Sequence, residues 1–169
     1  MDSIIEVVRC FENSNIIHVD GVINPTNDIE IIELELIYAD LETVSKRRER
    51  LKKQLKADKS LIKEDLVLEK IEKALNEGKS ARRLELTEEE RDIIKSLSLL
   101  TLKPLMYVAN VDEETIQDIE KNENFKKVKQ YAESQNAKVI PICVKLEEEI
   151  SSIESEDERK EFLEMMGLD

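Results

Sequence analysis

The 169-residue chain has few of the residues that build tight loops, with only three Gly and three Pro. A loop that cradles phosphate groups needs closely spaced glycines on a turn from a strand to a helix. Only Gly78-Lys79-Ser80 resembles the end of such a loop, and Lys73 stands where its earlier glycine should be. No Asp-x-x-Gly follows a strand-like run to hold Mg²⁺ through water. We therefore expect this chain alone not to hydrolyse a nucleoside triphosphate.

Cysteine and long apolar runs are also scarce. The two cysteines, Cys10 and Cys143, lie in apolar strand-like segments and form no CxxC or Cys/His cluster. They predict buried thiols, no metal site and a reducing, cytoplasmic compartment. No segment approaches the ~20 apolar residues that a membrane span requires. We expect no membrane contact.

The chain is strongly acidic, but its charge is unevenly distributed. The formal net charge is -13, which disfavours general binding to nucleic acid or anionic membranes. Residues 46–59 nevertheless hold eight basic residues against two acids, whereas residues 147–169 hold ten acids against two basic residues. A phosphate-rich partner is therefore expected only at the basic segment.

Helical periodicity dominates the middle of the chain. Asn24-Pro25 is a strong helix start, and the positions after it repeat at spacings of three and four. The expected seam consists of Leu34, Ile37, Leu41, Val44, Arg48, Leu51 and Leu55. A turn at 57–60 and a second periodic run to Leu75 predict an antiparallel coiled-coil arm. Thr87 to Glu90 is a capping box that predicts a third, short helix.

Strand-like runs flank this helical region. Residues 4–11, 105–109 and 139–144 are rich in apolar residues, and helical patterns at 125–137 and 157–168 follow the second and third runs. Alternation of strands and helices predicts a parallel sheet. The expected fold class is α/β with a large helical insertion. The insertion is expected at residues 25–100, and the α/β part at residues 1–24 and 101–169.

Asn110-Val111-Asp112-Glu113 follows the second strand-like run directly. Open α/β sheets bind ligands at the carboxyl ends of their strands. A guanine-reading loop there has the pattern Asn-Lys-x-Asp, in which the carboxylate accepts two hydrogen bonds from guanine. Glu113 and Val111 replace the Asp and the Lys, which removes the guanine clamp, while the Asn110 amide can still pair with a purine. Alternatively, these residues only cap a helix.

The longer context resembles one family. Residues 2–13 (DSIIEVVRCFEN), 24–30 (NPTNDIE), 33–42 (ELELIYADLE) and 100–111 (LTLKPLMYVANV) are similar to the Obg-like ATPases of the YchF family. The similarity spans this chain but covers only the middle of the proteins in that family. It implies a partial three-stranded parallel sheet of a Ras-like P-loop domain, together with the antiparallel coiled-coil arm.

The resemblance implies a nucleotide site at two strand ends. Asn110, Val111 and Glu113 correspond to the base-specificity loop, and Cys143, Val144 and Lys145 to a second loop that meets the base through its backbone. A buried strand end is the alternative for Cys143. ATP is the implied cofactor, with phosphate and Mg²⁺ ligands supplied by parts of the full-length protein that this chain lacks.

The resemblance also implies a ribosome or ribosomal RNA partner for the full-length protein. The candidate contact is the basic segment of the arm, whose residues are Lys46, Arg47, Arg48, Arg50, Lys52, Lys53, Lys56 and Lys59. A cationic helix face can bind phosphate groups. A solvated face that complements the helix C-terminus is the alternative.

Two functional hypotheses remain. In the first, the chain is the central part of a translation-associated ATP-binding and ATP-hydrolysing protein. In the second, it is a self-standing coiled-coil interaction module whose small α/β base is structural. In either case the apolar edge at Ile4 to Phe11 predicts pairing with another copy and a homo-oligomer.

Overall fold

The computed structural model describes residues 3–11 and 23–166. The chain forms two compact units. The helical unit comprises Met1–Ile4 and Glu30–Pro104, and the sheet unit comprises Ile5–Ile29 and Leu105–Asp169. The main segment of the helical unit is therefore residues 30–104, whereas the sequence predicted an insertion at residues 25–100.

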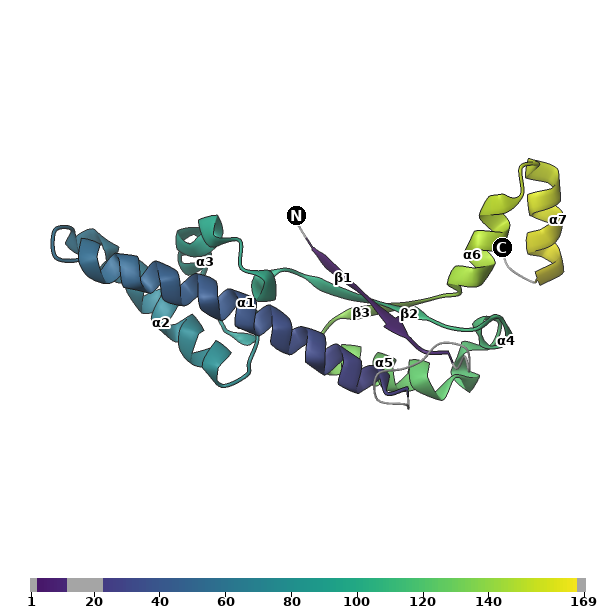
Figure 1. Cartoon of the computed structure of the whole chain (residues 1–169), viewed down its shortest axis with the longest axis horizontal. Coiled ribbons are helices and arrows are strands. Elements are labelled where there is room, and N and C mark those ends of the chain that lie inside the picture. Colours follow the sequence, from purple (N-terminus) through teal and green to yellow (C-terminus); the bar gives the residue numbers. More distant parts are fainter. Residues whose placement is uncertain (1–2, 12–22, 167–169) are drawn as a thin grey trace. The chain divides into compact units, whose positions relative to one another are not determined.

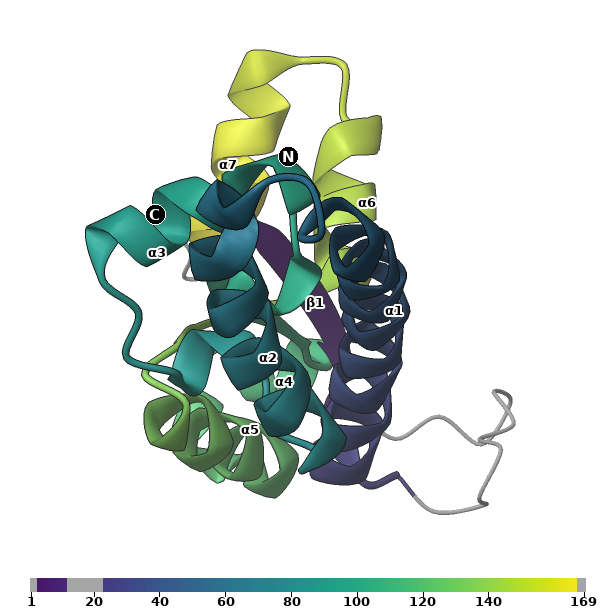
Figure 2. The same ribbon diagram turned by 90° about the vertical axis from the view of Figure 1, so that its left-hand side faces the viewer.

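A hairpin of two long helices forms most of the helical unit (Figures 1 and 2). Helix α1 spans Pro25–Gln54, a 3-10 turn spans Lys59–Leu61, and α2 spans Ile62–Asn76. Asn24 starts α1 as predicted, because its Oδ1 accepts hydrogen bonds from Thr26 Oγ1 and the Asn27 backbone. Ser45 Oγ donates to Glu72 and Arg47 donates to Glu64, so the two helices run antiparallel.

Most positions of the predicted seam form the core of this hairpin. Leu34 and Leu55 do not, and Leu55 lies beyond the end of α1 at Gln54. Ile37, Val44 and Leu51 of α1 are buried in one core that also contains Leu68 and Ile71 of α2. Leu34, however, is 44% exposed. Helix α2 ends four residues after Glu72, the partner of Ser45, so it does not reach as far along α1 as Leu34.

Short helices complete the unit. Thr87 forms the predicted capping box with Glu90 and starts α3, which spans Glu88–Ile94. Three 3-10 turns lie at Ala81–Arg83, Lys95–Leu97 and Leu100–Leu102. Ile94 and Leu99 bury their side chains in the same core as the hairpin.

A buried carboxylate on α1 fastens the end of this segment. Asp40 is 3% exposed, and its oxygens accept hydrogen bonds from the Leu100 and Thr101 backbones at 2.8 and 2.7 Å and from Thr101 Oγ1 at 2.6 Å. Thr101 Oγ1 also accepts from the Ala81 backbone, and Arg82 donates to the Thr101 carbonyl. Asp40 therefore binds the turn at Leu100–Leu102 directly, and Thr101 of that turn links it to the turn at Ala81–Arg83.

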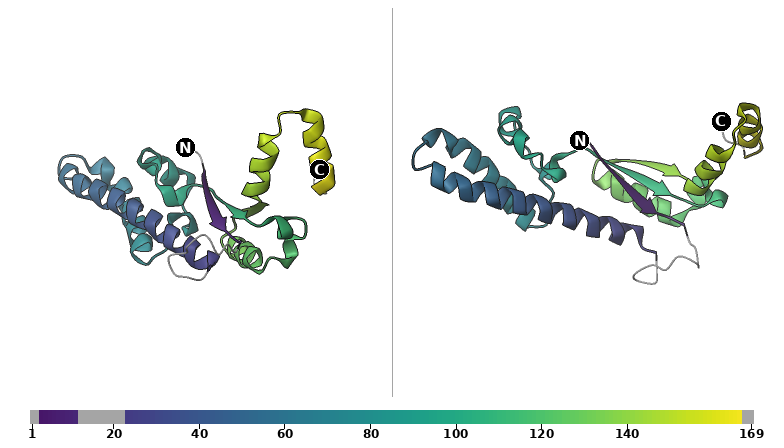
Figure 3. Two further views of the ribbon diagram at one scale, coloured as in Figure 1. Left: turned by 45° about the vertical axis from the view of Figure 1, so that its right-hand side comes forward. Right: turned by 45° about the horizontal axis from the view of Figure 1, so that its top comes forward.

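The sheet unit contains three strands in the order β1-β2-β3 (Figure 3). They span Ile4–Arg9, Leu105–Asn110 and Lys138–Ile142. Strands β2 and β3 are parallel, with Tyr107 opposite Val139. At the two ends of β1, Ile4 donates to the Pro104 carbonyl and Cys10 donates to the Asn110 carbonyl, which makes β1 parallel to β2 as well.

Helices follow β2 and β3, as the alternating pattern predicted. After β2 come α4 (Glu113–Ile116), a 3-10 turn (Ile119–Lys121) and α5 (Glu123–Ser134). After β3 come α6 (Val144–Ser152) and α7 (Glu156–Met166). The α/β fold class with a helical insertion is confirmed.

The two faces of the sheet differ. Val8, Tyr107 and Ala109 point to one face and pack against Phe125 and Val128 of α5. Side chains alternate along a strand, so Ile5 and Val7 point to the other face, as does Ile140. These three are 57%, 63% and 49% exposed, and no described element of the sheet unit buries them.

We predict that Asp40→Ala lowers the free energy of unfolding by about 2–4 kcal/mol, because the backbone N–H groups of Leu100 and Thr101 and the Thr101 hydroxyl lose their carboxylate acceptor. Urea denaturation followed by circular dichroism measures the change. Asp92→Ala, at an exposed position on α3, is the control and should change stability by less than about 0.5 kcal/mol. Equal stability of the two variants would contradict this role for Asp40.

Candidate functional site

The candidate nucleotide residues lie at the carboxyl edge of the sheet. In the β2–β3 register Asn110 is opposite Ile142, the last residue of β3. The backbone N–H of Val111 donates to the Ile142 carbonyl at 2.8 Å and continues the ladder by one residue. Parallel pairing therefore brings together two loops that are more than thirty residues apart in the sequence.

Asn110 connects these two loops directly. Its Oδ1 accepts a hydrogen bond from the backbone N–H of Val144 at 3.1 Å. Its carbonyl accepts from the Cys10 backbone, so β1 is attached at the same place. Among the described residues Asn110 Nδ2 makes no hydrogen bond, so it remains a free donor at this edge.

Glu113 and Lys145 form a second connection between the loops. Glu113 Oε1 lies 2.9 Å from Lys145 Nζ, and their side chains are 35% and 67% exposed. The hydrogen bond and the charge of Glu113 raise the pKa of Lys145 above its usual value. The edge thus presents an acceptor and a donor side by side. The sequence suggested only a backbone contribution from residues 143–145.

Val111 and Cys143 are buried beneath this edge. Val111 is 2% exposed and belongs to the core of the sheet unit, while Cys143 is 4% exposed at the start of α6. Their side chains therefore hold the strand ends in place and do not face solvent. Cys10 is buried as well, and the loss of solvent raises the pKa of its thiol to about 12.

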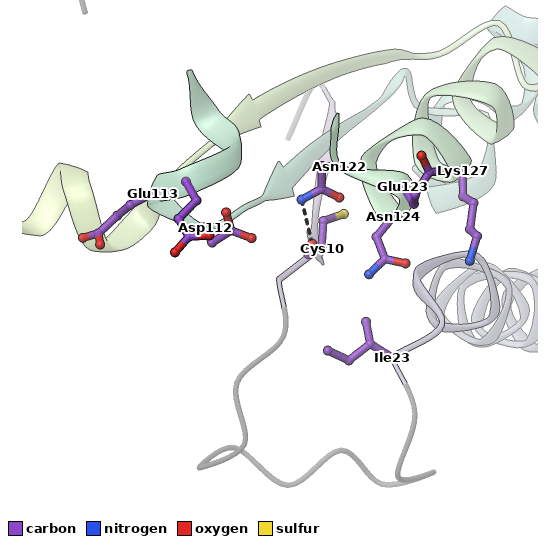
Figure 4. A pocket seen from close by; sticks show the side chains of 9 residues that line it. Cys10, Ile23, Asp112, Glu113, Asn122, Glu123, Asn124 and Lys127 are labelled. Carbon is purple, nitrogen blue, oxygen red and sulfur yellow. Dashed lines mark hydrogen bonds between the residues drawn. The ribbon is translucent and has the colours of Figure 1, made fainter. Parts of the chain in front are cut away.

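A polar network lies beside Asn110, and the sequence suggested only its helix cap within residues 110–113, not the part centred on Asn122. Asp112 caps α4 by accepting from the Thr115 backbone and hydroxyl. Asn122 donates from Nδ2 to the Cys10 carbonyl at 3.0 Å (Figure 4). Nδ2 also donates to Thr115 Oγ1, and Asn122 Oδ1 caps α5 by accepting from the Phe125 backbone. The signal in the sequence was an Asn just before an amphipathic helix, which is a common N-cap.

An open cleft of about 770 Å³ adjoins this network (Figure 4). Its described lining is acidic, with four carboxylates and one lysine: Asp112, Glu113, Glu114, Glu123 and Lys127. Such a lining repels phosphate groups. The cleft is therefore unsuited to the triphosphate of a nucleotide.

The basic segment of the arm separates into two groups. Arg47 makes a two-pronged ion pair with Glu64 at 2.6 and 2.8 Å, and Arg48 contacts Asp65, Glu69 and Glu72 on α2. Lys46 pairs with Glu42 one turn away. Within the described residues the other five make no ion pair and are exposed: Arg50, Lys52, Lys53, Lys56 and Lys59.

Arg48 explains how a charge is accommodated in the seam. Its side chain is only 13% exposed, but three carboxylates of α2 surround the guanidinium. Burial opposes the charge on Glu72, yet hydrogen bonds from Ser45 and Arg48 lower the pKa of Glu72 overall. Arg47 and Arg48 therefore stabilise the hairpin itself.

Comparison with known proteins shows the relationships of the chain. No family model matches. The ribosome-binding ATPase YchF of Bacillus subtilis is 47% identical over 169 residues, which cover 99% of this chain and 46% of the relative. The YchF protein of Escherichia coli O157:H7 is 43% identical with the same coverage. In sequence, this chain is a relative of YchF.

A solved structure agrees with this relationship. The Schizosaccharomyces pombe YchF GTPase matches with a TM-score of 0.83 and 33% identity, over 99% of this chain and 46% of that chain. The chain spans about half the length of the YchF relatives that it matches. Among its described helices, none combines the length and apolar character needed to cross a membrane.

We predict that Asn110→Ala speeds hydrogen exchange of the Val144 amide, because this amide loses its acceptor. The loss of one partly exposed hydrogen bond should cost about 0.5–1.5 kcal/mol, or roughly a two- to tenfold faster exchange. NMR-detected exchange measures this, with the Val108 amide inside β2 as an internal reference. Unchanged protection of Val144 would show that Asn110 does not hold the second loop.

Proposed function

We propose that the chain supplies the base-reading edge of an adenine-nucleotide-binding protein of the YchF type. The supporting observation is the convergence of Asn110, Glu113, Val144 and Lys145 at adjacent strand ends. The names of the relatives, ribosome-binding ATPase and GTPase, agree with a nucleotide ligand.

The available hydrogen-bonding groups suit a purine. The orientation of Asn110 is set by Val144, so its free Nδ2 can donate to the acceptor N7 of a purine. Glu113 can accept from the exocyclic amine of adenine, and its longer side chain and its ion pair with Lys145 displace it from the geometry that clamps guanine. The buried Val111 and Cys143 keep the two loops in register.

The phosphates and Mg²⁺ of ATP require partners other than this edge. Four carboxylates line the adjoining cleft, and the sequence lacks the glycine spacing of a phosphate loop. ATP hydrolysis is therefore a property that we propose for a full-length protein that contains this chain together with a phosphate loop. The chain itself contributes base selection.

Ribosome binding is the second part of the proposal. The bacterial relatives are named ribosome-binding ATPases. In this chain, basic residues between positions 50 and 59 are exposed on the arm. We accordingly propose that it acts in the cytoplasm. Co-sedimentation of the purified chain with ribosomes tests this part independently of nucleotide binding.

We predict that ATP shifts the NMR signals of the Val144 amide and the Asn110 side-chain amide. Binding should be weak, on the order of 1 mM, because the phosphates gain no contacts. Glu113→Asp should lower the ATP-to-GTP affinity ratio about tenfold, the value of one hydrogen bond, whereas the neighbouring Glu114→Asp should leave it unchanged. If neither nucleotide moves these signals, the edge is structural and the interaction-module hypothesis is favoured.

We further propose that the isolated chain self-associates through β1. This strand is at the edge of the described sheet, and Ile5 and Val7 expose an apolar face beside it. An unpaired apolar edge favours pairing with a second copy.

Light scattering should therefore give a mass above the 19.6 kDa of one chain, and Val7→Lys should reduce it to that value. Lysine at this exposed position adds a charge to the contact without entering the core. A wild-type monomer at about 100 μM would contradict self-association, because interfaces of ordinary size bind at micromolar or lower concentration.

A further inference from the structure

Lys145 presents unused cationic donors at the carboxyl edge of the sheet. Its Nζ lies 2.9 Å from Glu113 Oε1, whereas Glu149 Oε1 is 3.9 Å away, beyond hydrogen-bond distance. A lysine ammonium has three N–H donors. Among the described residues Lys145 makes no hydrogen bond other than the one to Glu113, and its side chain is 67% exposed. The remaining donors of the ammonium are therefore available to a ligand.

The fold alone does not account for a cation at this position. Cys143 is the N-cap of α6, so Lys145 is the second residue of the helix. Positive charge is unfavourable there, because the helix dipole already places partial positive charge at this end. The ion pair with Glu113 is accessible to solvent, and such pairs add little to stability. Lys145 therefore weakens its own helix and gains little from its partner, which indicates a role in binding.

The backbone holds Lys145 beside Asn110. The Val144 N–H donates to Asn110 Oδ1 at 3.1 Å, which fixes the residue just before Lys145. Glu113, three residues after Asn110 in the other loop, places its carboxylate against Lys145 Nζ. Asn110 Nδ2, the Glu113 carboxylate and Lys145 Nζ therefore offer a donor, an acceptor and a second donor within one short stretch of the edge.

Lys145 keeps its charge at this edge. The hydrogen bond and the charge of Glu113 raise the pKa of Lys145, which opposes the loss of water that a bound base would cause. The ammonium therefore remains a charged donor at neutral pH. Hydrogen bonds from a charged donor are stronger than those between neutral groups.

The edge of adenine carries the complementary groups in the complementary order. Along this edge adenine presents the acceptor N7, the amine donor N6 and the acceptor N1. Guanine presents the acceptor N7, the acceptor O6 and the donor N1–H, so its last two groups are reversed. On the same three protein groups, guanine would place O6 against the Glu113 carboxylate and N1–H against the Lys145 ammonium. Both contacts are repulsive.

We propose that Lys145 determines base specificity by donating a hydrogen bond from Nζ to N1 of adenine. This inference rests on the proposed base-reading edge, in which Asn110 contacts N7 and Glu113 contacts the N6 amine, and adds the third contact. The Glu113–Lys145 pair then reads the two neighbouring groups that distinguish adenine from guanine.

Base analogues that lack single ring nitrogens test this contact. The probes are AMP, 1-deaza-AMP, which lacks the N1 acceptor, and 7-deaza-AMP, which lacks the N7 acceptor. Lys145→Met removes the donor and keeps the length of the side chain, whereas Lys145→Arg retains charged donors. Lys121→Met is the matched control, because Lys121 forms a similarly exposed ion pair with Asp118 at 2.8 Å in the sheet unit. NMR titration of the Val144 amide signal measures each dissociation constant.

Wild type should bind AMP with a dissociation constant on the order of 1 mM, because the phosphate gains no contact. It should bind 1-deaza-AMP about tenfold more weakly, the loss of one charge-assisted hydrogen bond. Lys145→Met should bind AMP about tenfold more weakly than wild type and should no longer distinguish AMP from 1-deaza-AMP. Lys145→Arg should retain the discrimination, and Lys121→Met should behave like wild type. The loss on 7-deaza-AMP should be the same factor in wild type and Lys145→Met, because N7 faces Asn110.

The analogues separate this inference from the proposed function. If wild type binds 1-deaza-AMP as tightly as AMP but discriminates against 7-deaza-AMP, the base-reading edge stands and Lys145 does not contact N1. The same conclusion follows if Lys145→Met still discriminates against 1-deaza-AMP. If wild type binds none of the probes, or binds all three alike, the base-reading edge itself is wrong.

Discussion

Parallel pairing of β2 with β3 is the constraint on which the candidate nucleotide site depends. It places Asn110 opposite Ile142, so the loops that follow both strands leave the sheet at the same edge. The side chains of Asn110 and Lys145 therefore lie close enough to the facing loop to form the Asn110–Val144 hydrogen bond and the Glu113–Lys145 ion pair. A slip of one residue would turn Asn110 to the other face and separate these groups.

The helical unit depends on charged groups as much as on its apolar seam. Arg48 occupies a seam position and remains charged because carboxylates of α2 surround it. Asp40 is more deeply buried and serves as an acceptor for the returning segment at Thr101. A buried charge is tolerated only when hydrogen bonds satisfy it, and both residues meet this condition.

Local signals allowed much of this architecture to be predicted. The caps at Asn24 and Thr87 and the seam residues Ile37, Val44 and Leu51 lie as expected, because capping and helical spacing depend on neighbours within a few residues. Leu34 was wrongly assigned to the seam. Its exposure depends on where α2 ends, which the pattern of α1 does not contain.

By itself, the sequence determined the order of strands and helices, the arm, and the resemblance to YchF, since these are encoded in periodicity, turns and linear motifs. Only the tertiary structure decided which members of each candidate site are accessible. Val111 and Cys143 are buried, while Lys145 reaches Glu113. Among the eight basic residues of the segment 46–59, Arg47 and Arg48 form ion pairs with carboxylates at least seventeen positions away in the sequence. The physical reason is that such pairings arise between segments distant in the sequence, so a linear run of charge does not reveal which cations stay free.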